Sequence, residues 1–375
     1  MAGLLLAFAV VPRPDPPPPE VMLPPSAEAP RLRVEKQLLY SASIGGGPML
    51  VSRSGRLEQV NADGTERRVV AQNLRASAVV GPDRAGVLAA VDSGIVTRVE
   101  ANGTTRRLGP ADFVAGGLAG AGRRLLACPD PAEQPPDDGL LLDAVSGRAS
   151  RVRLGCPVAW AAHGGRFAGT GGPWTRLEGF RRAAAVPRGG SVLIGRPGTR
   201  PRVLLDTRRL RAAAGRGAVV DGLALSPDGK LVAVSAGRPG RPWLVLVVGA
   251  DGRQLASIPL AGGHRPAWLG WSDRQGSTTL AVAAVDRRGD LATAELAARQ
   301  GTRYVLAWQP GGSSRVLAAG VPMVAADGFA WSSDGGSVAV SSPAGVLVVK
   351  QADVVYTTAS PVTGTLLAWP AQAAP

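Results

Sequence analysis

Arginine residues are concentrated in one stretch of this sequence. The stretch from Arg176 to Arg216 holds eleven arginines against two carboxylates, Glu178 and Asp206, so eleven minus two, or nine, of the net +14 charges lie there. Guanidinium groups bind phosphates, carboxylates and anionic lipid head groups through paired N–H donors. Aromatic rings in the same stretch add stacking surface. The predicted binding residues are Trp174, Phe180, Arg181, Arg182, Arg208, Arg209 and Arg211.

A simpler interpretation of this charge stays open. Lys36, Lys230 and Lys350 are the only lysines, so the basic residues are almost all arginine, a bias that also fits a GC-rich genome. Arginines on outer strands and loops can serve only to solvate the surface. Nucleic acid is not the expected partner, because no helix-turn-helix, zinc-finger or RNA-binding motif accompanies the charge. The expected partner of this monomer is a protein or an anionic component of the cell envelope, the membrane surface included.

Catalytic and metal-binding motifs are not found. His163 and His264 lie in or beside two different turns, without a carboxylate or a second histidine at ligand spacing, so no metal site is expected. The sequence has no Gly-x-Ser-x-Gly elbow, no phosphate-binding loop that opens a helix and no Asp-rich calcium loop. No cofactor is expected either. Carboxylates that converge from distant parts of the chain could still form an active site that local motifs do not show.

Cys128 and Cys156 are the only two cysteines. They end two strands that we assign to one repeat unit, on the same side of its sheet, with a Pro-rich acidic loop from Pro129 to Gly139 between them. A disulfide between them would contribute about 3 to 4 kcal/mol in the chain-entropy account. The alternative is two unrelated buried thiols.

A repeated unit must position these residues. Its opening strand ends at or near Tyr40, Val80, Gly120, Trp160, Leu225, Trp271 and Trp331, and the first four of these positions lie 40 residues apart. In the clearest copies a short apolar run stops at a Ser, Pro, Asp or Gly turn and an alternating apolar run follows, which is typical of a β-hairpin. Asp228-Gly229 and Asp334-Gly335 supply the turn residues.

A second hairpin follows each first one. Its turns lie at 62–64, 101–103, 146–147, 197–198, 251–252, 310–312 and, more weakly, 351–353. Two hairpins make four strands, so seven units predict an all-β fold, a seven-bladed β-propeller of four-stranded antiparallel blades over residues 31–375. A strand from Arg31 to Lys36 or from Thr363 to Trp369 should close the ring. Helices are expected only within insertions, at Thr207 to Ala214 and Leu291 to Gln300.

The turn-and-strand unit resembles the repeat of TolB-like and WD40-like propellers. Its best copies run from Leu225 to Ser235 and from Trp331 to Ser341. The Gly-His and Trp-Asp pairs of true WD40 blades are missing, which favours the TolB-like branch. This resemblance implies a protein-binding or envelope-associated scaffold without catalysis. Trp271 and Trp331 belong to the unit and should pack between blades.

The N-terminus is a different kind of sequence. Residues 1–11 contain the apolar run Gly3 to Val11, and residues 12–30 are a Pro-rich tract that excludes helix and sheet. We interpret them as an export segment, or a truncated membrane anchor, followed by an extended linker. Ala7-Phe8-Ala9 has the form of a cleavage site, although no basic residue precedes the apolar run. The alternative is a cytoplasmic protein with a Pro-rich tail.

Two function hypotheses follow. The first is a non-catalytic propeller, exported or tethered to a membrane, that binds a protein or an anionic envelope partner. The second is a propeller enzyme, a lactonase-like or lyase-like hydrolase, with its site at the channel mouth. Acidic or histidine side chains that converge at the channel would favour the enzyme.

Overall fold

The computed structural model divides the chain into two units, Met1–Arg33 and Val34–Pro375. The expected N-terminal segments, the candidate strand from Arg31 to Lys36 and the candidate helix from Leu291 to Gln300 lie outside the described residues. The structure describes residues 47–81, 87–111, 113–117, 124–129, 138–162, 165–176, 183–185, 192–238, 241–260, 264–272, 278–286, 304–319, 328–332, 334–342, 345–350, 356–360 and 362–369.

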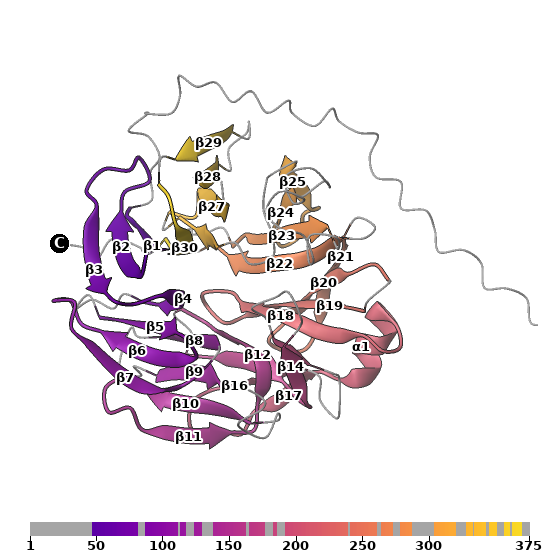
Figure 1. Ribbon diagram of the computed structural model, residues 1–375. Coiled ribbons are helices and arrows are strands. Elements are labelled where there is room, and N and C mark those ends of the chain that lie inside the picture. Colours follow the sequence, from indigo (N-terminus) through magenta and orange to yellow (C-terminus); the bar gives the residue numbers. More distant parts are fainter. Residues whose placement is uncertain are drawn as a thin grey trace, which may run out of the picture. The chain divides into compact units, whose positions relative to one another are not determined.

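The second unit is a seven-bladed β-propeller, as the repeat predicts. Seven antiparallel sheets succeed one another in chain order, from the indigo strands of blade 1 to the yellow strands of blade 7 (Figure 1). From the innermost strand outward, blade 1 contains β30 (Thr365–Ala368), β1 (Met49–Arg53), β2 (Arg56–Val60) and β3 (Arg68–Gln72); blade 2 contains β4 (Ala76–Val80), β5 (Leu88–Asp92), β6 (Ile95–Val99) and β7 (Thr105–Pro110); blade 3 contains β8 (Phe113–Gly117), β9 (Arg124–Cys128), β10 (Gly139–Asp143) and β11 (Ala149–Val152).

The later blades follow the same plan with longer connections. Blade 4 contains β12 (Gly155–Trp160), β13 (Phe167–Thr170), β16 (Val192–Gly195) and β17 (Arg202–Leu205); blade 5 contains β18 (Val219–Leu225), β19 (Leu231–Gly237), β20 (Leu244–Gly249) and β21 (Gln254–Pro259); blade 6 contains β22 (His264–Trp271), β23 (Leu280–Asp286), β24 (Tyr304–Trp308) and β25 (Arg315–Ala319); blade 7 contains β26 (Phe329–Trp331), β27 (Ser337–Ser342), β28 (Gly345–Lys350) and β29 (Tyr356–Ser360).

Blades 4 and 5 depart from four plain strands. A hairpin of β14 (Trp174–Arg176) and β15 (Ala183–Ala185) is inserted between β13 and β16, and it joins the inner edge of blade 5 through the pair Ala185 and Val220. The sheet of blade 5 therefore has six strands instead of the four expected. The helix α1 (Thr207–Ala214) connects blade 4 to blade 5 and has the bounds predicted from sequence.

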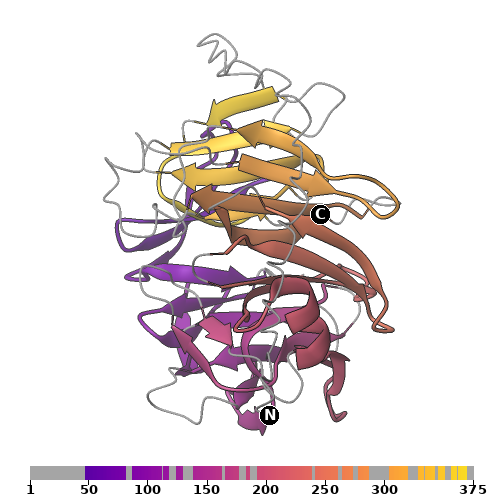
Figure 2. The same cartoon turned by 90° about the vertical axis from the view of Figure 1, so that its right-hand side faces the viewer.

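The ring is closed by the C-terminal strand. β30 pairs with β1 through Leu50 with Ala368 and Val51 with Leu366, so the second of the two candidate closing segments, Thr363 to Trp369, is confirmed. Each innermost strand contacts the next one around the ring, in the order β30, β4, β8, β12, β18, β22 and β26. In the turned view, too, indigo strands lie beside yellow ones (Figure 2). The opening strand expected near Tyr40 lies outside the described residues, and β30 takes the innermost place in blade 1.

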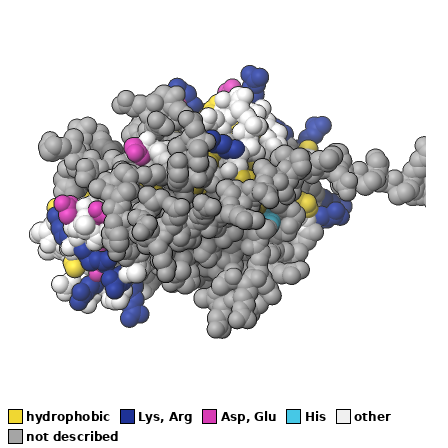
Figure 3. All heavy atoms as spheres, turned by 90° about the horizontal axis from the view of Figure 1, so that it is seen from above, with side chains coloured by type: hydrophobic (Ala, Val, Ile, Leu, Met, Phe, Trp, Pro, Cys, Tyr) yellow, Lys and Arg dark blue, Asp and Glu magenta, His cyan; other side chains and the backbone are white. Residues whose placement is uncertain are grey.

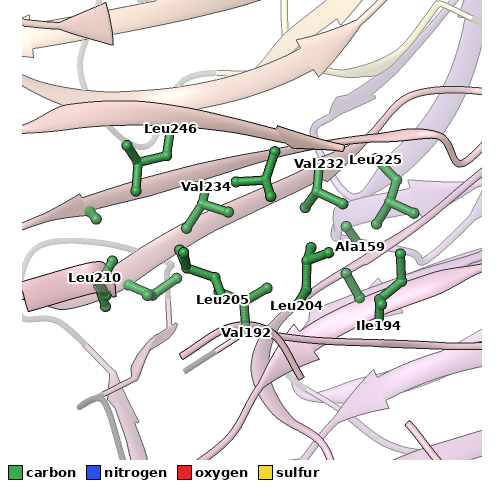
Figure 4. Packing of buried hydrophobic residues seen from close by; sticks show 14 of the residues in the cluster. Ala159, Val192, Ile194, Leu204, Leu205, Leu210, Leu225, Val232, Val234 and Leu246 are labelled. Atoms are coloured by element: carbon green, nitrogen blue, oxygen red, sulfur yellow. The ribbon is translucent and has the colours of Figure 1, made fainter. Parts of the chain in front are cut away.

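Apolar packing holds neighbouring blades together. A cluster of buried side chains spans each boundary from blade 1–2 round to blade 7–1. At the blade 4–5 boundary, Ile194 and Leu205 of blade 4 face Val232, Val234 and Leu246 of blade 5 (Figure 4). Burial of one such side chain is worth about 1.5 to 3 kcal/mol, so the boundaries are the main stabilising element of the ring.

The Ser and Asp side chains of the repeated Ser-x-Asp-Gly turn form their hydrogen bonds within the turn itself. In blade 5 the Ser226 hydroxyl donates to Asp228 Oδ1 at 2.7 Å and accepts from the Leu231 N–H at 2.9 Å. Gly229 has a φ of 69°, a region that glycine enters without steric cost. The copy in blade 7 is the same, with Ser332 donating to Asp334 at 2.6 Å. These repeated positions are therefore structural, and they leave few groups for a ligand.

The repeat tryptophans also link blades, as predicted. Trp271 Nε1 donates to the carbonyl of Ala224 in blade 5 at 3.1 Å, and Trp331 Nε1 donates to Gly270 in blade 6 at 2.8 Å. Both indoles are buried. A buried indole needs such an acceptor, and the neighbouring blade supplies it in both cases.

Among the described residues, no helix is long and apolar enough to cross a membrane.

Candidate functional site

Four arginines surround a cavity of about 190 Å³ on blade 4. Arg166 precedes β13, and the other three belong to the connection between β16 and β17 or to the first residue of β17. The first and third connections of an antiparallel meander lie at the same end of the sheet, which brings these segments together. We call this cavity the arginine pocket; it is lined by Arg166, Ile194, Gly195, Arg196, Thr199, Arg200 and Arg202.

A tight turn presents two of these arginines. The Thr199 N–H donates to the Arg196 carbonyl at 3.0 Å, and the Thr199 hydroxyl donates to the same carbonyl at 2.9 Å. Gly198, with a φ of 81°, permits the reversal. The turn is thus fixed by its own hydrogen bonds, and it holds Arg196 and Arg200 on the rim of the pocket with both side chains exposed.

The other two arginines are anchored to blade 5. Arg166 Nη1 donates to the Gly229 carbonyl at 3.0 Å, and Arg202 Nη2 donates to the Ala250 carbonyl. Each guanidinium has five N–H donors, so these bonds fix the position of the cation and leave other donors for the pocket.

Guanidinium bonds to the next blade recur around the ring. Arg68 of β3 donates to Ala101 of blade 2, and Arg106 of β7 donates to Val145 and Ser146 of blade 3 at 3.1 Å. Arginines at the start of outer strands thus tie a blade to the turn of its neighbour. Part of the basic excess is therefore structural.

The pocket is nevertheless strongly positive. The ion pairs among the described residues join Glu58 with Arg67, Glu100 with Arg98, Asp228 with Lys230 and Asp221 with Arg265. None of these pairs includes one of the four pocket arginines. Elsewhere the charges are mixed: in Figure 3 the largest visible group of Lys and Arg side chains has Asp and Glu side chains among it. Four cations around one cavity, none of them ion-paired with another described residue, attract an anion.

The residues predicted from sequence have different outcomes. Phe180, Arg181 and Arg182 lie outside the described residues, and Trp174 begins β14. Arg208 and Arg211 are exposed on α1. Their role in binding stays a prediction.

Arg209 has a structural position. It is half-buried, and its guanidinium donates to the carbonyls of Leu204 at 3.5 Å and of Gly252, in the blade 5 turn that also receives Arg202, at 2.7 Å. Asp206, one of the two acidic residues of the stretch, caps α1 by accepting from the Arg209 N–H at 2.7 Å. A charge reversal at Arg209 would therefore disturb the fold as well as the surface.

Sequence reasoning missed the pocket. Arg196, Arg200 and Arg202 lie in the predicted basic stretch but were not selected, and Arg166 lies outside it. The usable signal was the segment Arg196-Pro-Gly-Thr-Arg-Pro-Arg202, where a predicted tight turn carries an arginine on each side. The contribution of Arg166 required the fold, because another connection of the blade brings it in.

The cysteines form a disulfide, with Cα atoms 6.1 Å apart. The assignment to one repeat unit was wrong: Cys128 ends β9 of blade 3, whereas Cys156 belongs to β12, the innermost strand of blade 4. The end of a second strand and the start of the next blade's first strand lie on the same side, which brings the two residues together. Both side chains are completely buried.

Charged groups also lie at the starts of two inner strands, where the enzyme hypothesis places a site. Asp221 of β18 is buried and accepts from Arg265 Nε of β22 at 3.1 Å, while the Ser235 hydroxyl donates to its other oxygen. The His264 ring lies 5.0 Å from that of Tyr304. Both oxygens of Asp221 are thus engaged, one by Ser235 within blade 5 and the other by Arg265 of blade 6. His163 lies outside the described residues, and the residues that are described contain no group of three or more metal-ligating side chains.

The comparisons with known proteins show the fold alone. No protein-family model and no curated protein matches the sequence. A protein assigned as a 6-phosphogluconolactonase from Bacteroides uniformis is similar with a TM-score of 0.53 at 14% identity, over 85% of this chain and 96% of that one. A protein assigned as TolB from Agrobacterium tumefaciens has a TM-score of 0.41 at 16% identity, over 73% and 90%. A gluconolactonase from Xanthomonas campestris has 0.40 at 18%, over 86% and 91%. This chain is thus a β-propeller whose structural neighbours include TolB propellers.

Proposed function

We propose that this protein is a non-catalytic binding propeller outside the cytoplasm, and that it attaches to an anionic polymer of the cell envelope through the arginine pocket. The observation that carries the proposal is the cavity with four arginines that have no carboxylate partner among the described residues. Arg208 and Arg211, exposed on the neighbouring helix, would extend the contact along a chain-like ligand.

The disulfide supports the proposed compartment. Disulfides persist in oxidising surroundings such as the periplasm and the cell exterior and are rare in the cytoplasm, so the Cys128–Cys156 bond agrees with export. A fusion of residues 1–36 to a reporter that is active only outside the cytoplasm tests this part. Reporter activity is expected, and activity confined to a cytoplasmic reporter would contradict it.

A titration of the purified protein tests the binding function. The ligands are poly(glycerol phosphate) whose chains end in a phosphomonoester, vesicles containing phosphatidylglycerol and neutral phosphatidylcholine vesicles. We expect binding to the polymer, weakening as salt rises, because exposed charges are screened over about 8 Å at physiological ionic strength. Binding to anionic vesicles but not to the polymer would instead identify the membrane surface as the partner and contradict the proposal.

Matched variants assign the binding to the pocket. Arg196→Glu with Arg200→Glu reverses two exposed rim charges that make no guanidinium hydrogen bond with the described residues, and should abolish polymer binding. Arg151→Glu with Arg153→Glu makes the same change in charge at the exposed C-terminal end of the outer strand of blade 3 and just after it, and should leave most of the affinity. Equal losses in the two double variants would show that only net charge matters.

A further inference from the structure

The arginine pocket divides its cations into two kinds. Arg166, which is half-buried, and Arg202, which is exposed, are anchored by carbonyls of blade 5, so these two guanidinium groups stand at fixed places. Arg196 and Arg200 lie on the exposed rim, and within the described residues their guanidinium groups make no hydrogen bond. A ligand that enters would meet two preorganised donors and two that close over it, which lowers the ordering cost of binding.

The volume of the pocket favours a small chemical group as its ligand. Cavities that enclose a drug-sized ligand measure roughly 300 to 1,000 Å³, whereas this one measures about 190 Å³. Its remaining lining, Ile194, Gly195 and Thr199, adds no carboxylate. The Thr199 hydroxyl is already used within its own turn, so the guanidinium groups are the principal donors. The pocket therefore fits one anionic end group, with the rest of the ligand outside.

The number of arginines in the pocket favours a phosphomonoester over a carboxylate as the ligand. A carboxylate offers two oxygens and one negative charge, whereas a phosphomonoester offers three acceptor oxygens and a charge of about −1.5 to −2 at neutral pH. Planar guanidinium forks match phosphoryl oxygens in a bidentate way. We propose that the arginine pocket binds a single phosphomonoester group, the terminal phosphoryl group of an anionic ligand. This inference rests on the proposed function, since it names the chemical group that the same pocket recognises.

Calorimetric titrations with small probes test the inference. Inorganic phosphate, glycerol phosphate, dimethyl phosphate and acetate are each added to the full chain at constant ionic strength. We expect inorganic phosphate and glycerol phosphate to bind and the other two to bind much more weakly. Tighter binding of glycerol phosphate than of inorganic phosphate would point to an ester, and the reverse order to the free ion; either order supports phosphoryl recognition. Acetate or dimethyl phosphate binding as tightly as glycerol phosphate would overturn it.

The pH dependence gives a second readout. The second proton of a phosphomonoester has a pKa of about 6, so lowering the pH from about 7.5 to about 5.0 should weaken glycerol phosphate binding about tenfold. Arginine stays protonated throughout. The turns of blade 5 that contact Arg166 and Arg202 also carry Asp228, Lys230 and Asp251. Dimethyl phosphate, whose charge is constant over this range, controls for them, and an equal pH effect on both probes would contradict the inference.

Variants separate this inference from the proposed function. Arg196→Gln with Arg200→Gln should weaken glycerol phosphate binding by about tenfold or more, since charge-assisted hydrogen bonds are the strong ones. Arg151→Gln with Arg153→Gln is the matched control. If the pocket variant loses polymer binding but the native protein shows no affinity for glycerol phosphate, the inference fails and the binding function stands. If glycerol phosphate binds in the pocket but polymer binding is unchanged in the variant, the inference stands and the proposed function fails.

Discussion

The two boundaries of blade 4 are built differently. Toward blade 5 a large apolar cluster is continued by α1 and by arginines that reach carbonyls across the boundary. Toward blade 3 the buried members of the cluster are Leu126, Leu154 and Phe167, and the disulfide lies at the same boundary. The backbones approach closely there: a Cβ atom at Gly139 of blade 3 would lie 2.7 Å from the carbonyl oxygen of Leu154, in the connection to blade 4. Close backbones leave little room for side chains, and a covalent bond supplements the packing.

This difference shows how one blade can carry a site. The covalent boundary needs few side chains, whereas the boundary with blade 5 uses arginines as donors and sets their cations beside a cavity. Residues that stabilise the 4–5 boundary and residues that would bind a ligand are thus neighbours in the same turns. Stability and binding should respond separately when each set is changed.

The largest expected effect is at the blade 4–5 boundary. Leu205→Ala removes a completely buried side chain from the cluster and should lower the free energy of unfolding by about 4 kcal/mol, because a leucine-sized cavity remains. Urea unfolding measures this change. Val203→Ala, on the same strand but 48% exposed, is the control and should cost well under half as much. Similar losses in both would indicate that this boundary does not depend on apolar packing.

The disulfide at the blade 3–4 boundary comes next. Cys128→Ala with Cys156→Ala should cost about 3.5 kcal/mol, the loop-closure entropy for a separation of 28 residues. Reductant should destabilise the native protein by a similar amount and leave the double variant unaffected. Mass spectrometry without reductant should find no free thiol in protein from its native host. Two free thiols, or unfolding that is insensitive to reductant, would contradict the covalent role of this boundary.

A smaller effect separates structural from available arginines. Arg166→Met removes the donor to Gly229 and should cost about 1.5 kcal/mol, the usual contribution of a partly buried hydrogen bond from a charged group. Arg196→Met removes an exposed side chain and should change stability by no more than about 0.5 kcal/mol. A reversed order in urea unfolding would show that the two kinds of pocket arginine have been assigned wrongly.

The smallest effect concerns acid stability of the blade 5 turn that receives Arg166. Burial alone would raise the pKa of Asp228, but hydrogen bonds from the Lys230 N–H and the Ser226 hydroxyl outweigh it, so the pKa lies below the ordinary 3.8. A lowered pKa stabilises the fold above the ordinary value, and this stability is lost as the pH falls through the lowered one.

Asp228→Asn keeps the hydrogen-bond acceptor and removes the charge, so it should reduce stability slightly at neutral pH, by less than about 0.5 kcal/mol. Below the ordinary pKa the native protein should lose this advantage and the two stabilities should converge. The measurement is urea unfolding at a series of pH values. A difference that grows as the solution becomes acidic would have the wrong sign.

Much of the fold could be predicted because each blade is specified locally. The opening strands end at Val80, Trp160, Leu225, Trp271 and Trp331, as expected. In blades 5 and 7 the turn residues that follow form hydrogen bonds within the turn itself. The hairpin β14–β15 could not be predicted, because its position depends on an edge offered by another blade. The sequence likewise does not decide which strand closes the ring, since two segments have the same strand pattern.

The site was predicted only as a region. The density of charge in the sequence locates the basic stretch, but it does not show which guanidinium groups are hydrogen-bonded to backbone carbonyls. In sequence, Arg202 and Arg209 look like the other arginines of the stretch. Only the structure shows that both donate to one turn of blade 5. The partner of each arginine is set by contacts between blades, and these are long-range in sequence. The pairing of Cys128 with the next blade was missed for the same reason.

Closure by β30 makes this fold sensitive to how far synthesis has progressed. The last strand of the described residues fills the innermost place of blade 1. On a ribosome, every earlier blade can form its hairpins while the inner edge of β1 has no partner and offers unpaired N–H and C=O groups to other chains. Only when residues Thr365–Ala368 emerge can Val51 meet Leu366 and end that exposure. The pairing of these four residues thus separates a nascent chain in which the inner edge of β1 is exposed from a folded molecule in which that edge is paired.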